Sequence, residues 1–190
     1  MRLIKAEDPC ALDETARVLS RGGVALIPTD TVYGIAAHPR FPAAVERLYA
    51  AKKRDARKPV ALLAASAAAV SAFGAALEGR ALALARLHWP GALTLVLPCG
   101  GGFEGFRVPD SKFARDLCER CGGVLRVSSA NISGSEAAAD AAAALAALGA
   151  ECDIAVDGGP AAVGAASTVV KFASAGAVPE ILRAGPVEIA

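Results

Sequence analysis

Apolar residues recur along the chain with two spacings, one typical of amphipathic helices and one of short buried strands. Helical spacing predicts helices over residues 11–20, 42–52, 67–77, 80–88, 112–121 and 136–148. Short apolar runs between them predict strands over residues 24–27, 60–64, 93–97, 106–108, 124–127, 154–156, 168–172 and 180–182. Because the strands alternate with helices, we predict an α/β fold in one domain over residues 1–190, with a twisted, largely buried sheet and flanking helices.

The longest uncharged stretch, residues 60–77, is long enough to be considered as a membrane span. It is rich in Ala and Ser, and Ser66 has the character of a helix N-cap that divides it into a strand and a helix. The first ten residues lack the apolar core of a signal peptide. We therefore expect a cytoplasmic protein that makes no membrane contact.

The charges balance, with 20 Lys and Arg against 19 Asp and Glu and a net charge of +1. This balance excludes a globally basic nucleic-acid-binding protein, so any contact with nucleic acid has to be local. Aromatic residues make up only 5% of the chain while hydrophobic residues make up 54%, which predicts an aliphatic core.

The 5 cysteines are an odd, scattered set, which is typical of reduced thiols rather than of a disulfide framework. Cys118 and Cys121 form a C-x-x-C pair, but a structural zinc site would need a second pair. We interpret them as thiols on the inner side of a helix. His38 and His88 have no partner pattern for base catalysis or metal binding, and we interpret both as structural.

A polar loop, Pro28–Gly34, directly follows the strand predicted at 24–27 and carries the hydroxyl groups of Thr29, Thr31 and Tyr33 beside Asp30. Ligands of α/β sheets collect beyond the carboxyl ends of strands, so this loop is a candidate binding site. The alternative is an ordinary polar turn in which Asp30 caps a helix.

A basic segment, Lys52–Lys58, carries five cationic side chains and one acidic one in an otherwise neutral chain. Between a helix and a strand, such a segment could hold a polyphosphate through charge and bidentate guanidinium contacts. The alternative is a solvated basic turn.

A third segment, Ser128–Gly134, lies between a strand and a helix, where small residues leave backbone N–H groups free to bind an anion. The alternative is a plain capping turn. The chain has neither the P-loop motif nor G-x-G-x-x-G. Because no nucleophile is paired with a base, we expect chemistry by positioning and charge neutralisation, as in nucleotidyl or phosphoryl transfer.

Taken in order, these segments resemble the family of YrdC-like threonylcarbamoyl-AMP synthases. The resemblance covers about residues 20–187, is typical of the short single-domain form, and rests on six motifs: Pro28–Gly34, Lys52-x-Arg54 with Lys58-Pro59, Trp89–Leu97, Ser129-x-Asn131, Ser167-Thr168 and Leu182–Gly185.

The resemblance implies that L-threonine, bicarbonate or CO2, and ATP are converted into threonylcarbamoyl-AMP and pyrophosphate. Mg²⁺ would accompany ATP, with no protein ligands assigned. The product would pass to a tRNA threonylcarbamoyl transferase complex that modifies adenosine 37. A weak contact with RNA is also compatible with this role.

By motif, ATP-binding positions fall on Lys52, Arg54, Lys58, Ser129, Asn131 and Arg183, of which Lys52 and Arg54 would also stabilise charge during catalysis. Threonine-binding positions fall on Thr31, Arg107 and Ser167, and the Arg107 guanidinium is suited to bidentate capture of a carboxylate.

Several positions depart from the family pattern. Leu63 stands where some relatives have a histidine, Ala166 replaces an acid, and Asp30 replaces a glutamate. Arg126 lies inside a predicted strand and is expected either to face the nucleotide or to pair with an acid. The alternative function is a YciO-like or carbamoyltransferase-type paralogue that binds a nucleotide or RNA.

Overall fold

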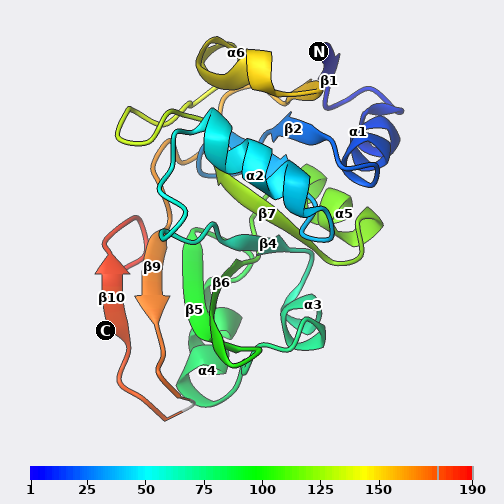
Figure 1. Cartoon of the computed structure of the whole chain (residues 1–190). Helices are drawn as coiled ribbons and strands as arrows, with labels where there is room; N and C mark the ends of the chain where they lie inside the picture. The colour runs from blue at the N-terminus through cyan, green and yellow to red at the C-terminus, as the bar shows by residue number, and fades with distance from the viewer. Residues whose placement is uncertain (175, 190) are drawn as a thin grey trace.

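A mixed sheet of ten strands runs through the whole molecule, with helices packed on both of its faces (Figure 1). The computed structural model describes residues 1–174 and 176–189. This architecture confirms the predicted α/β fold with a largely buried sheet.

The helices are α1 (Ala11–Leu19), α2 (Pro42–Ala51), α3 (Ala67–Ala72), α4 (Gly79–His88), α5 (Lys112–Arg120) and α6 (Ala141–Leu148). The strands are β1 (Arg2–Lys5), β2 (Val24–Ile27), β3 (Gly34–Ala37), β4 (Leu62–Ala64), β5 (Leu93–Cys99), β6 (Gly102–Arg107), β7 (Val124–Ser129), β8 (Ile154–Asp157), β9 (Thr168–Lys171) and β10 (Glu180–Arg183).

The strands lie in the order β1-β8-β2-β3-β7-β4-β6-β5-β9-β10. The β1–β8, β8–β2, β4–β6 and β5–β9 pairs are parallel and the remaining pairs are antiparallel. Figure 1 shows that β5, β9 and β10 turn away from the direction of β2 and β7. The sheet is therefore twisted, and we divide it into a first part, made of β1, β8, β2, β3 and β7, and a second part, made of β4, β6, β5, β9 and β10.

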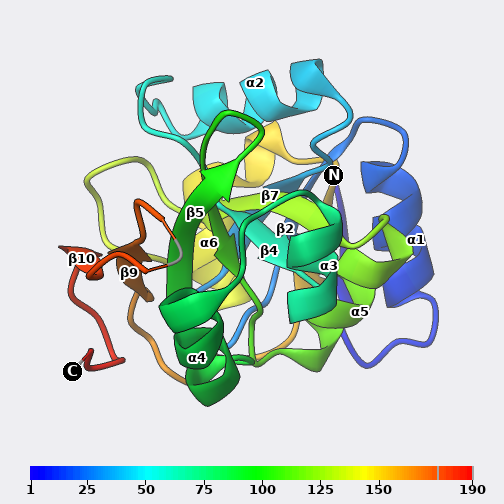
Figure 2. The ribbon, with the colours of Figure 1, turned by 90° about the horizontal axis from the view of Figure 1, so that it is seen from below.

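Three apolar clusters hold the helices to the sheet. In the first part of the sheet, α1 and α5 cover one face and α2 and α6 cover the other. In the second part, α3 and α4 pack against β4, β5 and β6 (Figure 2). Fully buried residues include Leu19, Leu48, Leu62 and Leu95, so the core is aliphatic as expected from the low aromatic content.

Two strands lie where the apolar pattern predicted none. β1 is an edge strand with only Ile4 buried, so it has no apolar run to mark it. β3 is buried throughout but consists of small residues, and it forms because the loop after β2 returns it antiparallel between β2 and β7. Pattern analysis missed both because partner strands, rather than side-chain propensity, stabilise them.

Other predictions were wrong at their boundaries. α6 begins at Ala141 instead of residue 136, because the Asp140 side chain caps it by accepting from the Ala143 N–H at 2.8 Å. α3 ends at Ala72 instead of 77, and β4 begins at Leu62 instead of 60. β6 starts at Gly102, well before residue 106, because it forms an antiparallel hairpin with β5.

Across the described ranges 1–174 and 176–189, no helix has both the length and the apolar character that a bilayer span requires. Residues 60–77 instead contain β4 and α3, with Ser66 as the N-cap that accepts from the Ala69 N–H at 3.2 Å. Cys118 and Cys121 are buried in the cluster between α1, α5 and the sheet, which confirms that they lie on the inner side of the helix. Burial raises the pKa of both thiols.

Candidate active site

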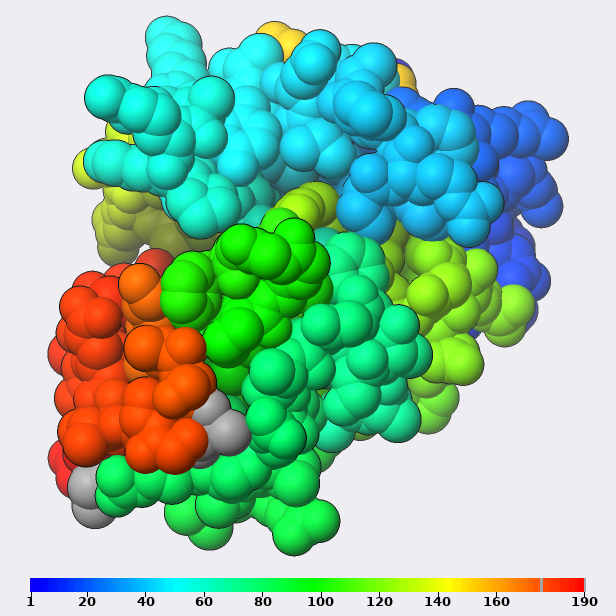
Figure 3. Space-filling model, turned by 60° about the horizontal axis from the view of Figure 1, so that its bottom comes forward, coloured from blue at the N-terminus to red at the C-terminus, as the bar shows by residue number. Residues whose placement is uncertain are grey.

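A cavity of about 480 Å³ opens between the two parts of the sheet. Its walls come from the loop after β2, the segment before β4, the β5–β6 hairpin, the end of β7, and β9 with β10. Figure 3 shows the hollow between the cyan segment that follows α2 and the orange and red strands near the C-terminus. Its volume falls in the range of about 300–1,000 Å³ that is usual for small-molecule sites.

The loop Pro28–Gly34 forms one end of the cavity and is held by its own hydroxyl groups. The Thr29 hydroxyl donates to the Val32 carbonyl at 2.6 Å and lies 3.2 Å from the Thr31 hydroxyl. Asp30 does not cap a helix; its carboxylate pairs with Arg107 at 2.5 Å. The candidate binding loop is therefore a rigid turn that presents Thr31 to the cavity.

Arg107, at the end of β6, is anchored on three sides. Its Nε donates to the Gly91 carbonyl at 2.8 Å, one terminal nitrogen donates to Thr31 and the other to Asp30. Burial lowers the pKa of this guanidinium, and the Asp30 carboxylate opposes that shift. Of the five N–H groups of an arginine, two remain for a ligand. Arg107 can therefore bind a carboxylate with its position already set.

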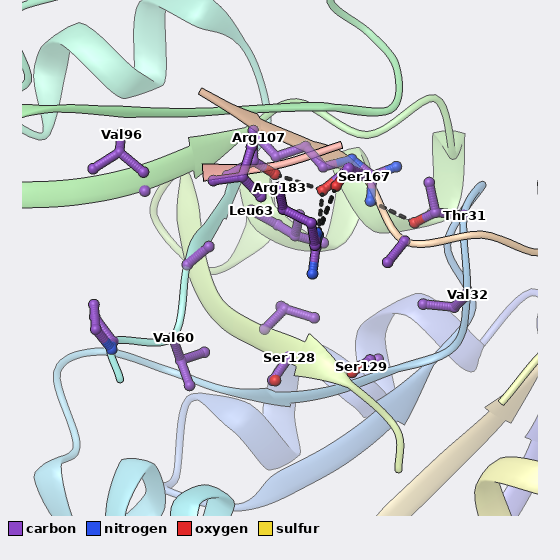
Figure 4. A pocket seen from close by; sticks show the side chains of 18 of the residues that line it. Thr31, Val32, Val60, Leu63, Val96, Arg107, Ser128, Ser129, Ser167 and Arg183 are labelled. Carbon is purple, nitrogen blue, oxygen red and sulfur yellow. Dashed lines mark hydrogen bonds between the residues drawn. The ribbon is translucent and has the colours of Figure 1, made fainter. Parts of the chain in front are cut away.

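A second hydroxyl cluster lies beside Arg107 (Figure 4). The Ser167 hydroxyl lies 2.8 Å from that of Thr94 on β5, and it accepts from Arg183 at 3.2 Å. Arg183 also donates twice to the Ser167 carbonyl, at 2.9 and 2.7 Å. A Cβ at residue 185 would lie 2.6–2.8 Å from backbone atoms of residues 166–168, so only Gly185 allows the chain to return so closely.

Lys52 is buried at the end of α2 and does not line the cavity. Its ammonium group donates to the carbonyls of Ser129 and Asn131 and to the Asn131 side-chain oxygen. Burial and the neighbouring Arg54 lower its pKa to about 8. These contacts use all three ammonium protons, so Lys52 holds the Ser129–Asn131 loop from behind.

Asn131 completes that loop. Its amide donates to the Ile132 carbonyl at 3.0 Å and the Ser135 carbonyl at 2.7 Å, while its oxygen accepts from Lys52. Ser128 and Ser129 line the cavity, whereas Asn131 does not. Lys52 and Asn131 therefore orient the backbone of the Ser129–Asn131 loop, and the loop presents the Ser129 hydroxyl to the cavity.

The basic segment divides into two parts. Arg54 lines the cavity and donates to the carbonyls of Lys58 and Pro59 at 2.9 and 3.2 Å. Arg57 is exposed and pairs with Asp55 at 2.8 Å, and the exposed Lys58 side chain does not line the cavity. Of the three side chains Arg54, Arg57 and Lys58, only Arg54 thus lines the cavity.

Arg126 pairs with an acid. Its two terminal nitrogens contact the Glu104 carboxylate at 2.6 and 2.8 Å, and one of them also donates to the Val60 carbonyl at 2.7 Å. Because Val60 lines the cavity, this pair supports the wall that carries Arg54. Of the two alternatives stated from sequence, pairing of Arg126 with an acid is therefore the correct one.

The charged side chains that line the cavity are all cationic: Arg54, Arg107, Lys171 and Arg183. Six Ser and Thr residues also line it: Thr29, Thr31, Thr94, Ser128, Ser129 and Ser167. Such a cavity favours a ligand that carries several negative charges and also offers hydrogen-bond acceptors.

The structure brings most of the predicted site residues together. Thr31, Arg54, Arg107, Ser129, Ser167 and Arg183 line one cavity, as do Leu63 and Ala166, which depart from the family pattern. Lys52, Lys58 and Asn131 do not line it.

Thr94, Lys171 and Phe103 also line the cavity although none was assigned a role from sequence, whereas Ser128 lies in the candidate segment Ser128–Gly134. Thr94 is the single polar residue within the apolar run 93–97, and that signal was available. Lys171 and Phe103 had no signal, because strand pairing brings them together: the Lys171 ammonium lies 4.5 Å from the Phe103 ring centroid.

Comparison with known proteins identifies the family of this chain. Residues 17–185 match the model of the Sua5, YciO and YrdC family, whose description is "Telomere recombination". A Mycobacterium leprae protein with the provisional name threonylcarbamoyl-AMP synthase is 40% identical over 183 residues, covering 90% of this chain and 81% of that protein.

Two longer relatives are also similar. The threonylcarbamoyl-AMP synthase of Bacillus subtilis is 32% identical over 193 residues, covering 96% of this chain but 55% of its own. The crystal structure of P. abyssi Sua5 complexed with L-threonine superposes with a TM-score of 0.88 at 29% identity, covering 97% of this chain and 57% of that one. The family model spans nearly the whole chain, including every segment that lines the cavity, and this chain belongs to the Sua5/YciO/YrdC family.

Proposed function

We propose that this chain is an L-threonylcarbamoyl-AMP synthase. The observation that carries the proposal is one cavity in which four cationic side chains and six Ser or Thr hydroxyls meet, with no carboxylate among the described residues that line it. Relatives named as synthases and a relative's complex with L-threonine support the same assignment. Family membership alone does not separate it from the YciO-like alternative, since the family includes both.

In the proposed reaction, the amine of L-threonine attacks CO2, loses a proton and becomes a carbamate. A carbamate oxygen then attacks the α-phosphorus of ATP. The bond between that phosphorus and the bridging oxygen breaks, and pyrophosphate leaves with the electron pair. The second step brings two anions, the carbamate and ATP, together, so the protein has to orient them and neutralise their charge.

The two ends of the cavity suit the two substrates. Arg107 has two free N–H groups for the threonine carboxylate, and Thr31 and Ser167 offer hydroxyl groups beside it. Arg54 and Ser129 line the region proposed for ATP, and Arg183, which contacts Ser167, would bind ATP where the two regions meet. Lys52 and Asn131 would act by orienting the Ser129–Asn131 backbone, and the exposed Lys58 would add charge near the entrance.

Divalent cations prefer carboxylate oxygens, whereas the charged side chains that line this cavity are cations. The lining residues therefore do not fit a resident Mg²⁺ site, and we propose that Mg²⁺ enters bound to the phosphates of ATP.

The biological setting follows from the proposed product. Threonylcarbamoyl-AMP is a reactive mixed anhydride, which would pass to a tRNA threonylcarbamoyl transferase complex in the cytoplasm. The exposed side chains of Lys53, Arg57 and Lys58 would supply any weak contact with RNA.

The test is pyrophosphate release from ATP and Mg²⁺, with threonine and bicarbonate omitted in turn. We expect release that requires both, together with formation of a threonine-containing adenylate. Release that is equal without threonine, or no release with every substrate present, would overturn the proposal.

A further inference from the structure

Thr94 lies in the Trp89–Leu97 motif and lines the cavity, but no role was assigned to it from sequence. It lies on β5, its side chain is buried, and the only hydrogen-bond partner of its hydroxyl within residues 1–174 and 176–189 is Ser167, at 2.8 Å. Both residues line the cavity at the end where Arg107 and Thr31 also lie.

One of the two O–H protons of Thr94 and Ser167 has no acceptor among the residues that the structure describes. The pair has two O–H groups, and the hydrogen bond between them uses one. Arg183 donates into the pair, to Ser167 at 3.2 Å, so it supplies no acceptor. Within the described part of the chain, neither hydroxyl makes a hydrogen bond to any other acceptor. The remaining O–H can be satisfied only from the cavity.

We infer that Ser167 donates to Thr94 and that the Thr94 hydroxyl donates its own proton to an oxygen of the amino-acid substrate, which makes Thr94 a specificity-determining residue. The inference rests on the proposed function. An oxygen placed there accepts the unclaimed proton, whereas a methyl group leaves a buried donor unsatisfied, which is costly. The oxygen can belong to the side-chain hydroxyl or to the carboxylate, since both substrate groups are acceptors.

The experiment compares Thr94→Val, which keeps shape and strand preference, with Thr94→Ser, which keeps the hydroxyl. Thr15→Val serves as the matched control, because it removes a buried threonine hydroxyl in α1, remote from the cavity. Threonine affinity is measured by calorimetry, and KM values for threonine and ATP by pyrophosphate release.

We expect Thr94→Val to weaken threonine binding about tenfold or more, while the KM for ATP stays within about twofold. Thr94→Ser and Thr15→Val should bind threonine like the wild type. Adding Ser167→Ala to Thr94→Val should weaken threonine binding no further, because Ser167 acts by orienting the Thr94 donor, which the first substitution has already removed.

Two further ligands identify the oxygen. If Thr94→Val narrows the preference for L-threonine over L-valine, the acceptor is the side-chain hydroxyl; if it narrows the preference for L-threonine over L-threoninamide, the acceptor is the carboxylate. Unchanged threonine affinity in Thr94→Val, or additive losses in the double variant, would overturn the inference. Because affinity is read without catalysis, this outcome is distinct from failure of the synthase reaction.

Discussion

Lys52 and Arg107 show how burial changes what a cationic side chain does. Both are buried and bonded to protein acceptors, yet Arg107 keeps two donors for a ligand whereas Lys52 keeps none. The difference lies in the number of N–H groups, five on a guanidinium against three on an ammonium. An arginine can be anchored and still bind, while a fully anchored lysine orients its neighbours.

Lys52 predicts opposite pH trends for activity and stability. Its pKa in the folded protein is about 8, below the ordinary value of 10.5. As pH rises through about 8, the folded protein loses this proton and a loop contact, so kcat/KM for ATP should fall. Between about 8 and 10.5 the unfolded chain binds more protons than the folded one, so this lysine makes the unfolding free energy rise with pH.

Lys52→Met should lower kcat/KM for ATP about tenfold to a hundredfold, since charge-assisted hydrogen bonds contribute about 1.5–3 kcal/mol each. The remaining activity of Lys52→Met should not decline near pH 8. The unfolding free energy of both proteins is measured against pH, and the difference between the two curves gives the contribution of Lys52. A wild-type decline that persists in Lys52→Met would contradict the assignment.

The buried pair of Asp30 and Arg107 predicts a large effect on stability. Their side chains are each 7% exposed, so removing one partner strands a buried charge. Asp30→Asn should lower the unfolding free energy by about 3–5 kcal/mol, measured by urea denaturation. The KM for threonine should also rise, because Arg107 loses an anchor.

Asp55→Asn is the matched control. Asp55 pairs with Arg57, but these side chains are 38% and 90% exposed, and solvent screens such a pair. The midpoint of urea denaturation should hardly change. Equal losses in the two variants would show that burial does not set the strength of the Asp30–Arg107 pair.

At the scale of elements, the turn between α2 and β4 is a cavity wall as well as a connection. The Tyr49 hydroxyl accepts from the Val60 N–H at 3.0 Å, Arg54 holds the carbonyls of Lys58 and Pro59, and Arg126 holds that of Val60. Charged and aromatic side chains thus fix a segment that has no regular structure of its own.

This arrangement predicts that Arg54 and Arg57 differ in function. Arg54→Ala removes a guanidinium that lines the cavity and should lower kcat on the order of a hundredfold or more. Arg57→Ala, three residues away but paired outside the cavity, should stay within about twofold of the wild type. The readout is pyrophosphate release, with melting temperature as the check on folding. Similar losses in both variants would indicate a diffuse basic patch.

At the scale of the whole molecule, the charge is nearly balanced but unevenly placed. The net charge is +1, yet the charged side chains lining the cavity are cations. Nucleotide binding should therefore depend on a local field rather than on the overall charge.

Salt tests this distribution. Raising the ionic strength from ~0.1 M to ~1 M shortens the Debye length from about 10 Å to about 3 Å. The KM for ATP should rise several-fold, while the KM for zwitterionic threonine should change less than about twofold. The comparison uses initial rates of pyrophosphate release with the second substrate saturating. A larger effect on threonine than on ATP would contradict the proposed division of the cavity.

The sequence by itself predicted the α/β class, the aliphatic core and the segments that carry the site. Those properties are local: apolar spacing reports which face of an element is buried, and polar loops stand out where they interrupt that spacing. Ser66 as a helix N-cap and the inward side of Cys118 followed from such local rules.

The tertiary structure alone decided which polar side chains meet. Strand order sets β5 beside β9, which brings Thr94 to Ser167, and β6 opposite the loop after β2, which brings Arg107 to Asp30. These partners are 73 and 77 residues apart, beyond the reach of any periodicity. Strand pairing also stabilises β3 between β2 and β7. Tertiary contacts bury Lys52 against the Ser129–Asn131 loop and leave Arg54 at the cavity wall. In each case hydrogen-bonded neighbours, rather than sequence neighbours, determine where a side chain lies.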